Sequence, residues 1–193
     1  MKTTNFLLVG VGGQGTLLAS NVLAEVGLRA GYEVKKSEVH GMAQRGGSVS
    51  SHVRWGQTVF SPLIGAGEVD ILVAFERLEA LRYLSMLRPG ARVLVNDYAI
   101  VPMSVTAGDA VYPSREEIVA TLRQVTPEVH LIDGIAIAEA LGNARVNNVV
   151  ILGALSQWLE VDAALWETVI TERVPSRYKE LNIEAFRRGR ARP

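Results

Sequence analysis

The sequence predicts a three-layer α/β fold of the Rossmann-like kind, built on an open and mostly parallel sheet. Short apolar runs alternate with helical stretches along the chain, and the first run ends in a glycine-rich turn. No internal repeat or low-complexity tract interrupts this pattern. The length of 193 residues fits one ordinary domain, so we expect residues 1–193 to form a single unit.

The first part of the chain supplies three expected strands. Phe6 to Val9 is a short apolar run ended by glycine, which is typical of a buried parallel strand. Thr16 to Ala30 carries an apolar face and stops before Gly31, where a helix commonly ends. Glu33 to Val39 and the alternating segment Ser48 to Trp55 are the next strands. Because no helix separates these two, we expect the later one to be antiparallel, which makes the sheet mixed.

The second part supplies three more strands. Val69 to Phe75 is an apolar run, and Glu76 to Leu87 is expected to be a helix that Pro89-Gly90 ends. Strands are then expected at Arg92 to Val95 and at Val129 to Ile132.

Helices are expected to fill the rest of the chain. Ser114 and Glu117 have the spacing of a capping box, which predicts a helix start. Asn147 to Leu159 is apolar nearly all round and should be a buried helix. A helix from about Asp162 and a terminal helix ending at Gly189 complete the chain.

Composition limits what the chain binds. It contains no cysteine, which excludes iron–sulfur clusters and structural zinc held by thiolates. With three histidines, we expect no metal ligands in this chain. The formal net charge of zero argues against nucleic acid and favours self-association of the isolated chain. The first apolar run is too short for a signal segment or a membrane span, so we expect a cytoplasmic protein without membrane contact.

The first glycine loop matches the G-x-G-x-x-G pattern and lies between a strand and a helix. Free N–H groups at a helix start favour an anion such as phosphate. We therefore assign cofactor contacts to Gly10, Gly12, Gly13, Gln14 and Gly15. Two alternatives remain: a tight turn without a ligand, or a dinucleotide site. For the latter, the acidic residue that should hold the ribose is ambiguous.

A second glycine-rich loop follows the second expected strand. It interleaves glycines with His40, Gln44 and Arg45 and ends in Gly46-Gly47, and we assign cofactor contacts to these five residues. Arg45 carries a planar fork suited to phosphate or carboxylate. Loops at the carboxyl ends of strands converge in open α/β sheets, so we expect the two loops to form one anion-receptive crevice. The alternative is a solvated turn without a ligand.

Both motifs have counterparts in a known family. Gly10 to Gly15, Ala19 and Arg45 to Ser48 together resemble the gamma-type subunit or domain of pyruvate and 2-oxoacid:ferredoxin oxidoreductases. The string Glu38 to Gly47 is similar to the beta subunit of indolepyruvate ferredoxin oxidoreductase, and the similarity extends to Ser61-Pro62 and most of the chain.

The resemblance implies a reaction and its partners. A 2-oxoacid, here an arylpyruvate such as indolepyruvate, is decarboxylated on thiamine diphosphate. Electrons pass through iron–sulfur clusters to ferredoxin, and the acyl group goes to coenzyme A. Since this chain lacks cysteine and a thiamine signature, both centres should lie in a large partner subunit. We expect no catalytic residue here, no cofactor bound by the chain alone, and coenzyme A as the family's candidate ligand at the interface.

Two other functions compete with this small-subunit hypothesis. One is a stand-alone Rossmann-type nucleotide-binding oxidoreductase. The other is a structural interaction module whose glycine loops only make turns. Copurification of a large cysteine-rich subunit would distinguish the small-subunit hypothesis from the stand-alone oxidoreductase. Ligand titration would distinguish the structural module from both.

Overall fold

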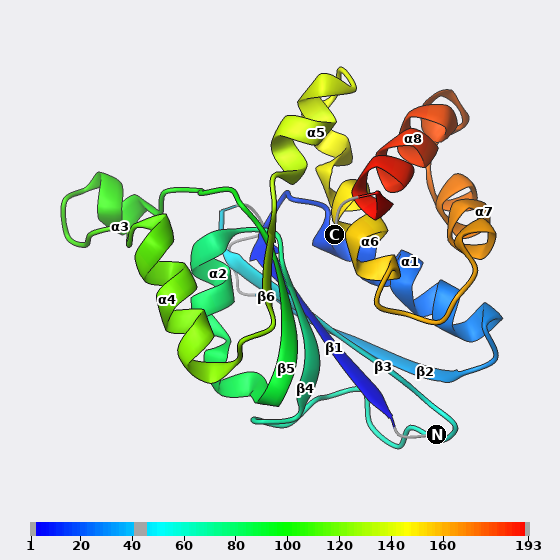
Figure 1. Cartoon of the computed structure of the whole chain (residues 1–193), viewed down its shortest axis with the longest axis horizontal. Helices are drawn as coiled ribbons and strands as arrows, with labels where there is room; N and C mark the ends of the chain where they lie inside the picture. Colours follow the sequence, from blue (N-terminus) through cyan, green and yellow to red (C-terminus); the bar gives the residue numbers. More distant parts are fainter. Residues whose placement is uncertain (1–2, 41–45, 192–193) are drawn as a thin grey trace.

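A six-stranded sheet with helices on both faces forms the centre of the molecule (Figure 1). The computed structural model describes residues 3–40 and 46–191, and of His40 only the backbone. The strands are β1 (Thr4–Val11), β2 (Glu33–His40), β3 (Ser48–Gly56), β4 (Val69–Ala74), β5 (Leu87–Asn96) and β6 (Val129–Ile132). Across the sheet their order is β2-β3-β1-β4-β5-β6.

The sheet is mixed, and the expected fold class is confirmed. Strand β3 runs antiparallel to both of its neighbours, β1 and β2. The pairs β1–β4, β4–β5 and β5–β6 are parallel. Because β1 and β2 point the same way, their carboxyl ends lie at one edge of the sheet, where β3 begins.

Helices cover the two faces unequally (Figure 1). The helices are α1 (Thr16–Arg29), α2 (Arg77–Arg82), α3 (Met103–Thr106), α4 (Arg115–Val125), α5 (Gly134–Ala140), α6 (Asn147–Ser156), α7 (Ala163–Arg173) and α8 (Lys179–Arg190). Short 3-10 turns lie at Leu84–Met86, Ala144–Val146 and Ser176–Tyr178. Phe6 and Leu8 of β1 face a core with α1, α6, α7 and α8, whereas Leu7 and Val9 face a core with α2 and α4. No helix among the described residues is long and apolar enough to cross a membrane.

Helix α6 is buried along its whole length, as its apolar sequence predicts, but it ends at Ser156 and not at the expected Leu159. It crosses α8 backbone to backbone. A methyl group on Gly153 would lie 2.1 Å from the carbonyl oxygen of Phe186, and one on Gly189 would lie 1.9 Å from that of Val150. Glycine is therefore required at both crossing positions, because a backbone carbonyl cannot move aside like a flexible side chain.

The two boundaries expected beside Pro89-Gly90 are wrong. The helix expected from Glu76 to Leu87 ends at Arg82, and β5 already begins at Leu87. Pro89-Gly90 does not end a helix but lies within β5, where the pairing with β4 skips several residues. Gly90 has a φ of +73°, so the dipeptide forms an irregularity in the strand, the kind of position that accepts proline.

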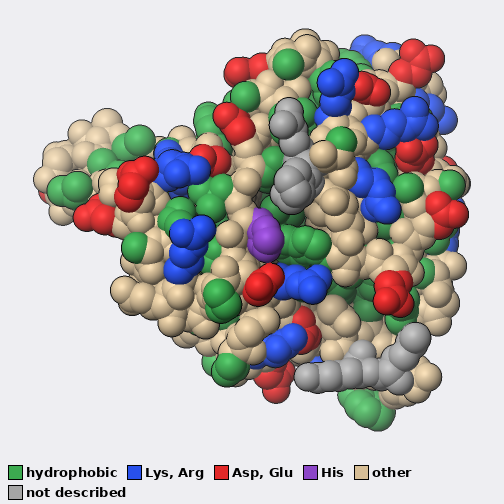
Figure 2. Space-filling view, viewed as in Figure 1, with side chains coloured by type: hydrophobic (Ala, Val, Ile, Leu, Met, Phe, Trp, Pro, Cys, Tyr) green, Lys and Arg blue, Asp and Glu red, His purple; other side chains and the backbone are tan. Residues whose placement is uncertain are grey.

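The segment between β5 and α4 projects from the body as an arm that carries α3 (Figure 1, Figure 2). The sequence did not predict this arm. The capping box at the start of α4 is confirmed: the Glu117 N–H donates to the Ser114 hydroxyl oxygen at 3.2 Å, and the Ser114 N–H donates to the Glu117 carboxylate at 2.8 Å.

Candidate functional site

The first glycine loop connects β1 to the start of α1. Gly13 and Gly15 have φ angles of +109° and +81°, so the turn needs residues that tolerate positive φ. No side chain caps α1, and its first turn holds no acidic residue. Its first N–H groups therefore keep the partial positive charge that attracts anions.

The Gln14 side chain holds the loop against the sheet. Its side-chain oxygen accepts from the Val11 N–H at 2.8 Å, and its side-chain nitrogen donates to the Phe75 carbonyl at 2.8 Å. Both ends of the amide thus bind backbone groups of β1 and of the residue after β4. The structure gives Gln14 a supporting contact, and its expected contact with a ligand stays a prediction.

The loop glycines have different tasks. A methyl group on Gly10 would lie 2.9 Å from the Gln14 side-chain oxygen, and one on Gly15 would lie 2.2 Å from Nδ2 of Asn148. These two glycines allow close packing. An added methyl on Gly13 would meet nothing within 4 Å, so Gly13 faces open space.

The two glycine loops meet at the carboxyl edge of the sheet. The Gly12 N–H donates to the Gly47 carbonyl at 2.8 Å, and the Gly46 N–H donates to the Gly12 carbonyl at 3.4 Å. The expected convergence of the loops is confirmed for these residues. His40 ends β2, but its side chain is not described, and Gln44 and Arg45 lie outside the described residues.

A buried carboxylate of α2 binds Ser48, the residue that follows Gly47 and begins β3. The Ser48 hydroxyl, the first side chain after Gly47, donates to Oε2 of Glu79 at 2.5 Å, and Arg82 pairs with Oε1 at 3.0 Å. Glu79 is only 4% exposed. Burial raises the pKa of the Glu79 carboxyl, while the bond from Ser48 and the charge of Arg82 act to lower it. Sequence reasoning missed this contact because its partners are separated along the chain.

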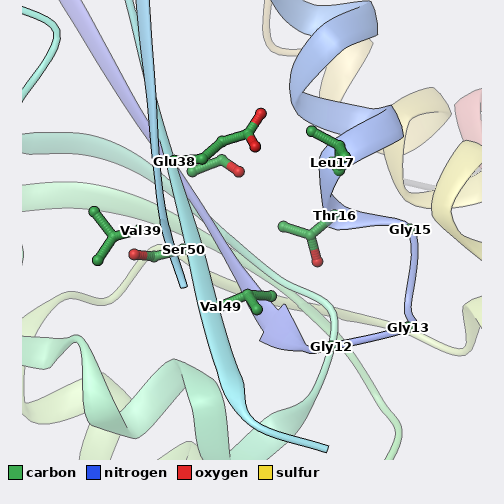
Figure 3. Close-up of a pocket in the computed structure, with 10 residues that line it drawn as sticks. Gly12, Gly13, Gly15, Thr16, Leu17, Glu38, Val39, Val49 and Ser50 are labelled. Atoms are coloured by element: carbon green, nitrogen blue, oxygen red, sulfur yellow. The ribbon is translucent and has the colours of Figure 1, made fainter. Parts of the chain in front are cut away.

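A hollow of about 440 Å³ lies between the start of α1, the end of β2 and the start of β3. Figure 3 shows Glu38 of β2 reaching across it towards Leu17 of α1, while Val39 points to the other face of the sheet. Glu38 forms an ion pair with Lys36. Thr16 also lines the hollow, and its buried hydroxyl has no hydrogen-bond partner among the described residues.

A second hollow, of about 630 Å³, lies on the other side of the first glycine loop. Besides the loop, it is lined by Tyr98, Ile100, Ile135, Ala144, Arg145 and Asn147. Arg145 forms no ion pair with any residue that the structure describes. Helix α6 begins at Asn147 without a side-chain cap. A free guanidinium, a second helix start and the glycine loop therefore surround this hollow, which the sequence did not predict.

The described residues contain no group of three or more His, Cys, Asp or Glu side chains placed to hold a metal ion. The chemistry that the site offers is recognition of an anion by backbone N–H groups, helix termini and one arginine. Fold and loops thus define a Rossmann-like domain whose candidate ligand site lies at the carboxyl edge of the sheet.

The family model described as pyruvate ferredoxin/flavodoxin oxidoreductase matches residues 5–192. The indolepyruvate oxidoreductase subunit IorB of Archaeoglobus fulgidus is 43% identical over 187 residues, which cover 96% of this chain and 92% of that protein. The chain therefore belongs to the pyruvate ferredoxin/flavodoxin oxidoreductase family, and the resemblance found in its motifs is confirmed.

Solved structures share the fold. The gamma subunit of a keto/oxoacid ferredoxin oxidoreductase from Geobacter sulfurreducens matches with a TM-score of 0.71 and 25% identity, covering 96% of this chain and 95% of that one. A 2-oxoglutarate:ferredoxin oxidoreductase from Magnetococcus marinus, solved with 2-oxoglutarate, coenzyme A and succinyl-CoA bound, matches with a TM-score of 0.75 and 21% identity. That match covers 99% of this chain but 31% of the other, so the fold also occurs as one part of a longer polypeptide.

Proposed function

We propose that the chain is the small subunit of a 2-oxoacid:ferredoxin oxidoreductase of the indolepyruvate type. It supports the coenzyme A-dependent oxidative decarboxylation of an arylpyruvate, with ferredoxin as electron acceptor. Its relatives of 35–43% identity are named as subunits of indolepyruvate oxidoreductases. The absence of cysteine supports a division of labour in which a larger subunit holds the iron–sulfur clusters and thiamine diphosphate.

The glycine loops are the proposed binding site for a phosphate-bearing group of coenzyme A. The observation that carries this proposal is the contact between Gly12 and Gly47, because it brings both loops together at the start of α1. The unpartnered Thr16 hydroxyl supports it, since a buried polar atom without a partner is rare and suggests a site completed by another group. Arg145 supplies a cation on the opposite side of the first loop.

The strand order makes a dinucleotide site less favourable. In a dinucleotide fold, the acidic residue that holds the ribose ends the strand next to the glycine-loop strand. Here β3 lies between β1 and β2, which places Glu38 two strands, or about 10 Å, from β1. Glu38 is also neutralised by Lys36. The stand-alone nucleotide-binding enzyme is therefore the weaker alternative.

Two aspartate substitutions test the proposed ligand site in the purified complex. Gly13 and Gly31 both have positive φ, and a methyl on either would meet nothing within 4 Å. They flank the two ends of α1, whose 14 residues separate them by about 21 Å. Gly13→Asp places a negative charge in the glycine loop, whereas Gly31→Asp is a control with similar backbone strain.

We expect Gly13→Asp to raise the KM for coenzyme A by at least about tenfold, because like charges repel in a recognition site. The KM for the oxoacid should stay within about twofold, and Gly31→Asp should change neither constant. Equal coenzyme A kinetics in both variants would show that the loops serve chain reversal or subunit docking instead. From the sequence, Arg45→Ala should also weaken coenzyme A binding, and Arg45→Lys should restore it only in part.

A further inference from the structure

The arm between β5 and α4 has the surface of a docking element. None of the residues from Asp97 to Glu117 is buried. Met103 is 88% exposed and Val111 is 90% exposed. Isolated hydrophobic residues on a protein surface are ordinary. Two almost fully exposed apolar side chains on one projecting arm, however, are not explained by the fold of this chain.

The root of the arm is held firmly, although its tip is not buried. The carboxylate of Glu76, which is 1% exposed, accepts from the Ile100 N–H at 3.1 Å and from the Tyr112 hydroxyl. Burial and the neighbouring Glu76 raise the pKa of Tyr112, so its hydroxyl remains a donor. Asp97 pairs with Arg115 at 2.7 Å. A fixed root reduces the conformational entropy lost when the tip binds a partner.

The charge of the arm indicates the chemistry of its partner. Between residues 98 and 112, Asp109 is the one charged residue in the sequence. Nucleic acid and anionic membrane surfaces recruit clustered Lys and Arg, which this segment lacks. The core of a protein interface is poor in charge and rich in methionine and aromatic side chains. The arm therefore fits an apolar groove on another protein.

The position of the arm points to the partner. Tyr98 and Ile100 at its root line the hollow beside the first glycine loop. We propose that the arm, residues 98–112, docks into an apolar groove of the larger subunit of the complex and so brings that subunit over the glycine-loop site. This inference rests on the proposed function, which requires a ligand at the loops to reach chemistry performed by the larger subunit. It also agrees with the longer Magnetococcus chain, in which a similar fold is covalently joined to the rest of the protein.

The test uses the complex of this chain with the larger subunit. A double variant, Met103→Glu with Val111→Glu, charges the tip of the arm. Phe60→Glu is the matched control, because Phe60 is 95% exposed on the loop between β3 and β4. Circular dichroism and thermal unfolding of each variant establish that the isolated chain still folds. Calorimetric titration with the larger subunit then gives the dissociation constants.

We expect the double variant to weaken association by at least about tenfold, and Phe60→Glu by less than about twofold. A second double variant, Met103→Leu with Val111→Ile, should bind like the unaltered chain. Equal affinity of the charged variant and the Phe60 control would overturn the inference. The inference would also be overturned if the charged double variant lost the self-association of the isolated chain but bound the larger subunit as tightly as the unaltered chain does. If the unaltered chain fails to bind the larger subunit at all, the proposed function itself is wrong.

Discussion

Gly15→Ala tests how the first glycine loop is locked in place. Gly15 has a φ of +81°, which costs an L-residue about 1–2 kcal/mol. The added methyl would lie 2.2 Å from Nδ2 of Asn148, and overpacking of this kind costs about 1–3 kcal/mol. Asn148 would also lose its 3.4 Å hydrogen bond to the Gly15 carbonyl, worth about 0.5–1.5 kcal/mol. We therefore expect the free energy of unfolding to fall by about 2.5–6.5 kcal/mol.

Gly13→Ala provides the comparison for this prediction. Gly13 also has positive φ, but its added methyl would meet nothing within 4 Å, so we expect a loss of about 1–2 kcal/mol. Urea unfolding of the purified chain at low concentration, followed by circular dichroism, measures both losses and the m-values. Equal losses in the two variants, or a loss below about 1 kcal/mol for Gly15→Ala, would refute the conclusion that Asn148 packs the loop into place.

Three further predictions concern single side chains. Burial raises the pKa of Glu79, so the ionised carboxyl lowers the stability of the folded chain above its ordinary pKa of 4.5. Glu79→Gln should therefore gain stability relative to the unaltered chain as the pH rises above 4.5, and parallel curves of stability against pH for the two proteins would contradict this. Ser114→Ala removes the hydroxyl that accepts from the Glu117 N–H and should cost about 0.5–2 kcal/mol in urea unfolding, whereas no measurable loss would show that the cap is dispensable. Arg145→Ala should raise the KM of the complex for coenzyme A by about tenfold and leave the KM for the oxoacid unchanged. The control is Arg123→Ala, which should alter neither constant because Arg123 is exposed on α4. An unaltered KM for coenzyme A in Arg145→Ala would show that Arg145 is not part of the site.

The alternation of strands and helices could be predicted because each apolar run is short and bounded by a turn residue. The antiparallel β3 was also predictable, since too few residues separate it from β2 for a helical crossover. The start of β5 was not. Pro89-Gly90 normally ends an element, and only the pairing with β4 shows that the strand passes through it. The arm with α3 gave no periodic pattern, because its apolar side chains from Tyr98 to Val111 do not pack against a core of this chain.

The site was predictable to the extent that topology determines it. Two loops at the carboxyl ends of β1 and β2 had to lie at one edge, and the Gly12–Gly47 hydrogen bond confirms this. Contacts between distant segments could not be read from local pattern. Glu79 reaches Ser48 from another element, and Asn148 packs on Gly15 from 133 residues away. Arg145 becomes part of the hollow only because α6 lies beside the first loop.

Our proposal makes this chain a subunit that contributes a ligand site and performs no oxidation alone. Its most direct test is indolepyruvate- and coenzyme A-dependent reduction of ferredoxin, measured for this chain alone, for the copurified larger subunit alone and for the two combined. We expect full activity in the combined sample and none with this chain alone. Reduction of ferredoxin by this chain free of the larger subunit, or full activity of the larger subunit without this chain, would show that the proposed division of labour is wrong.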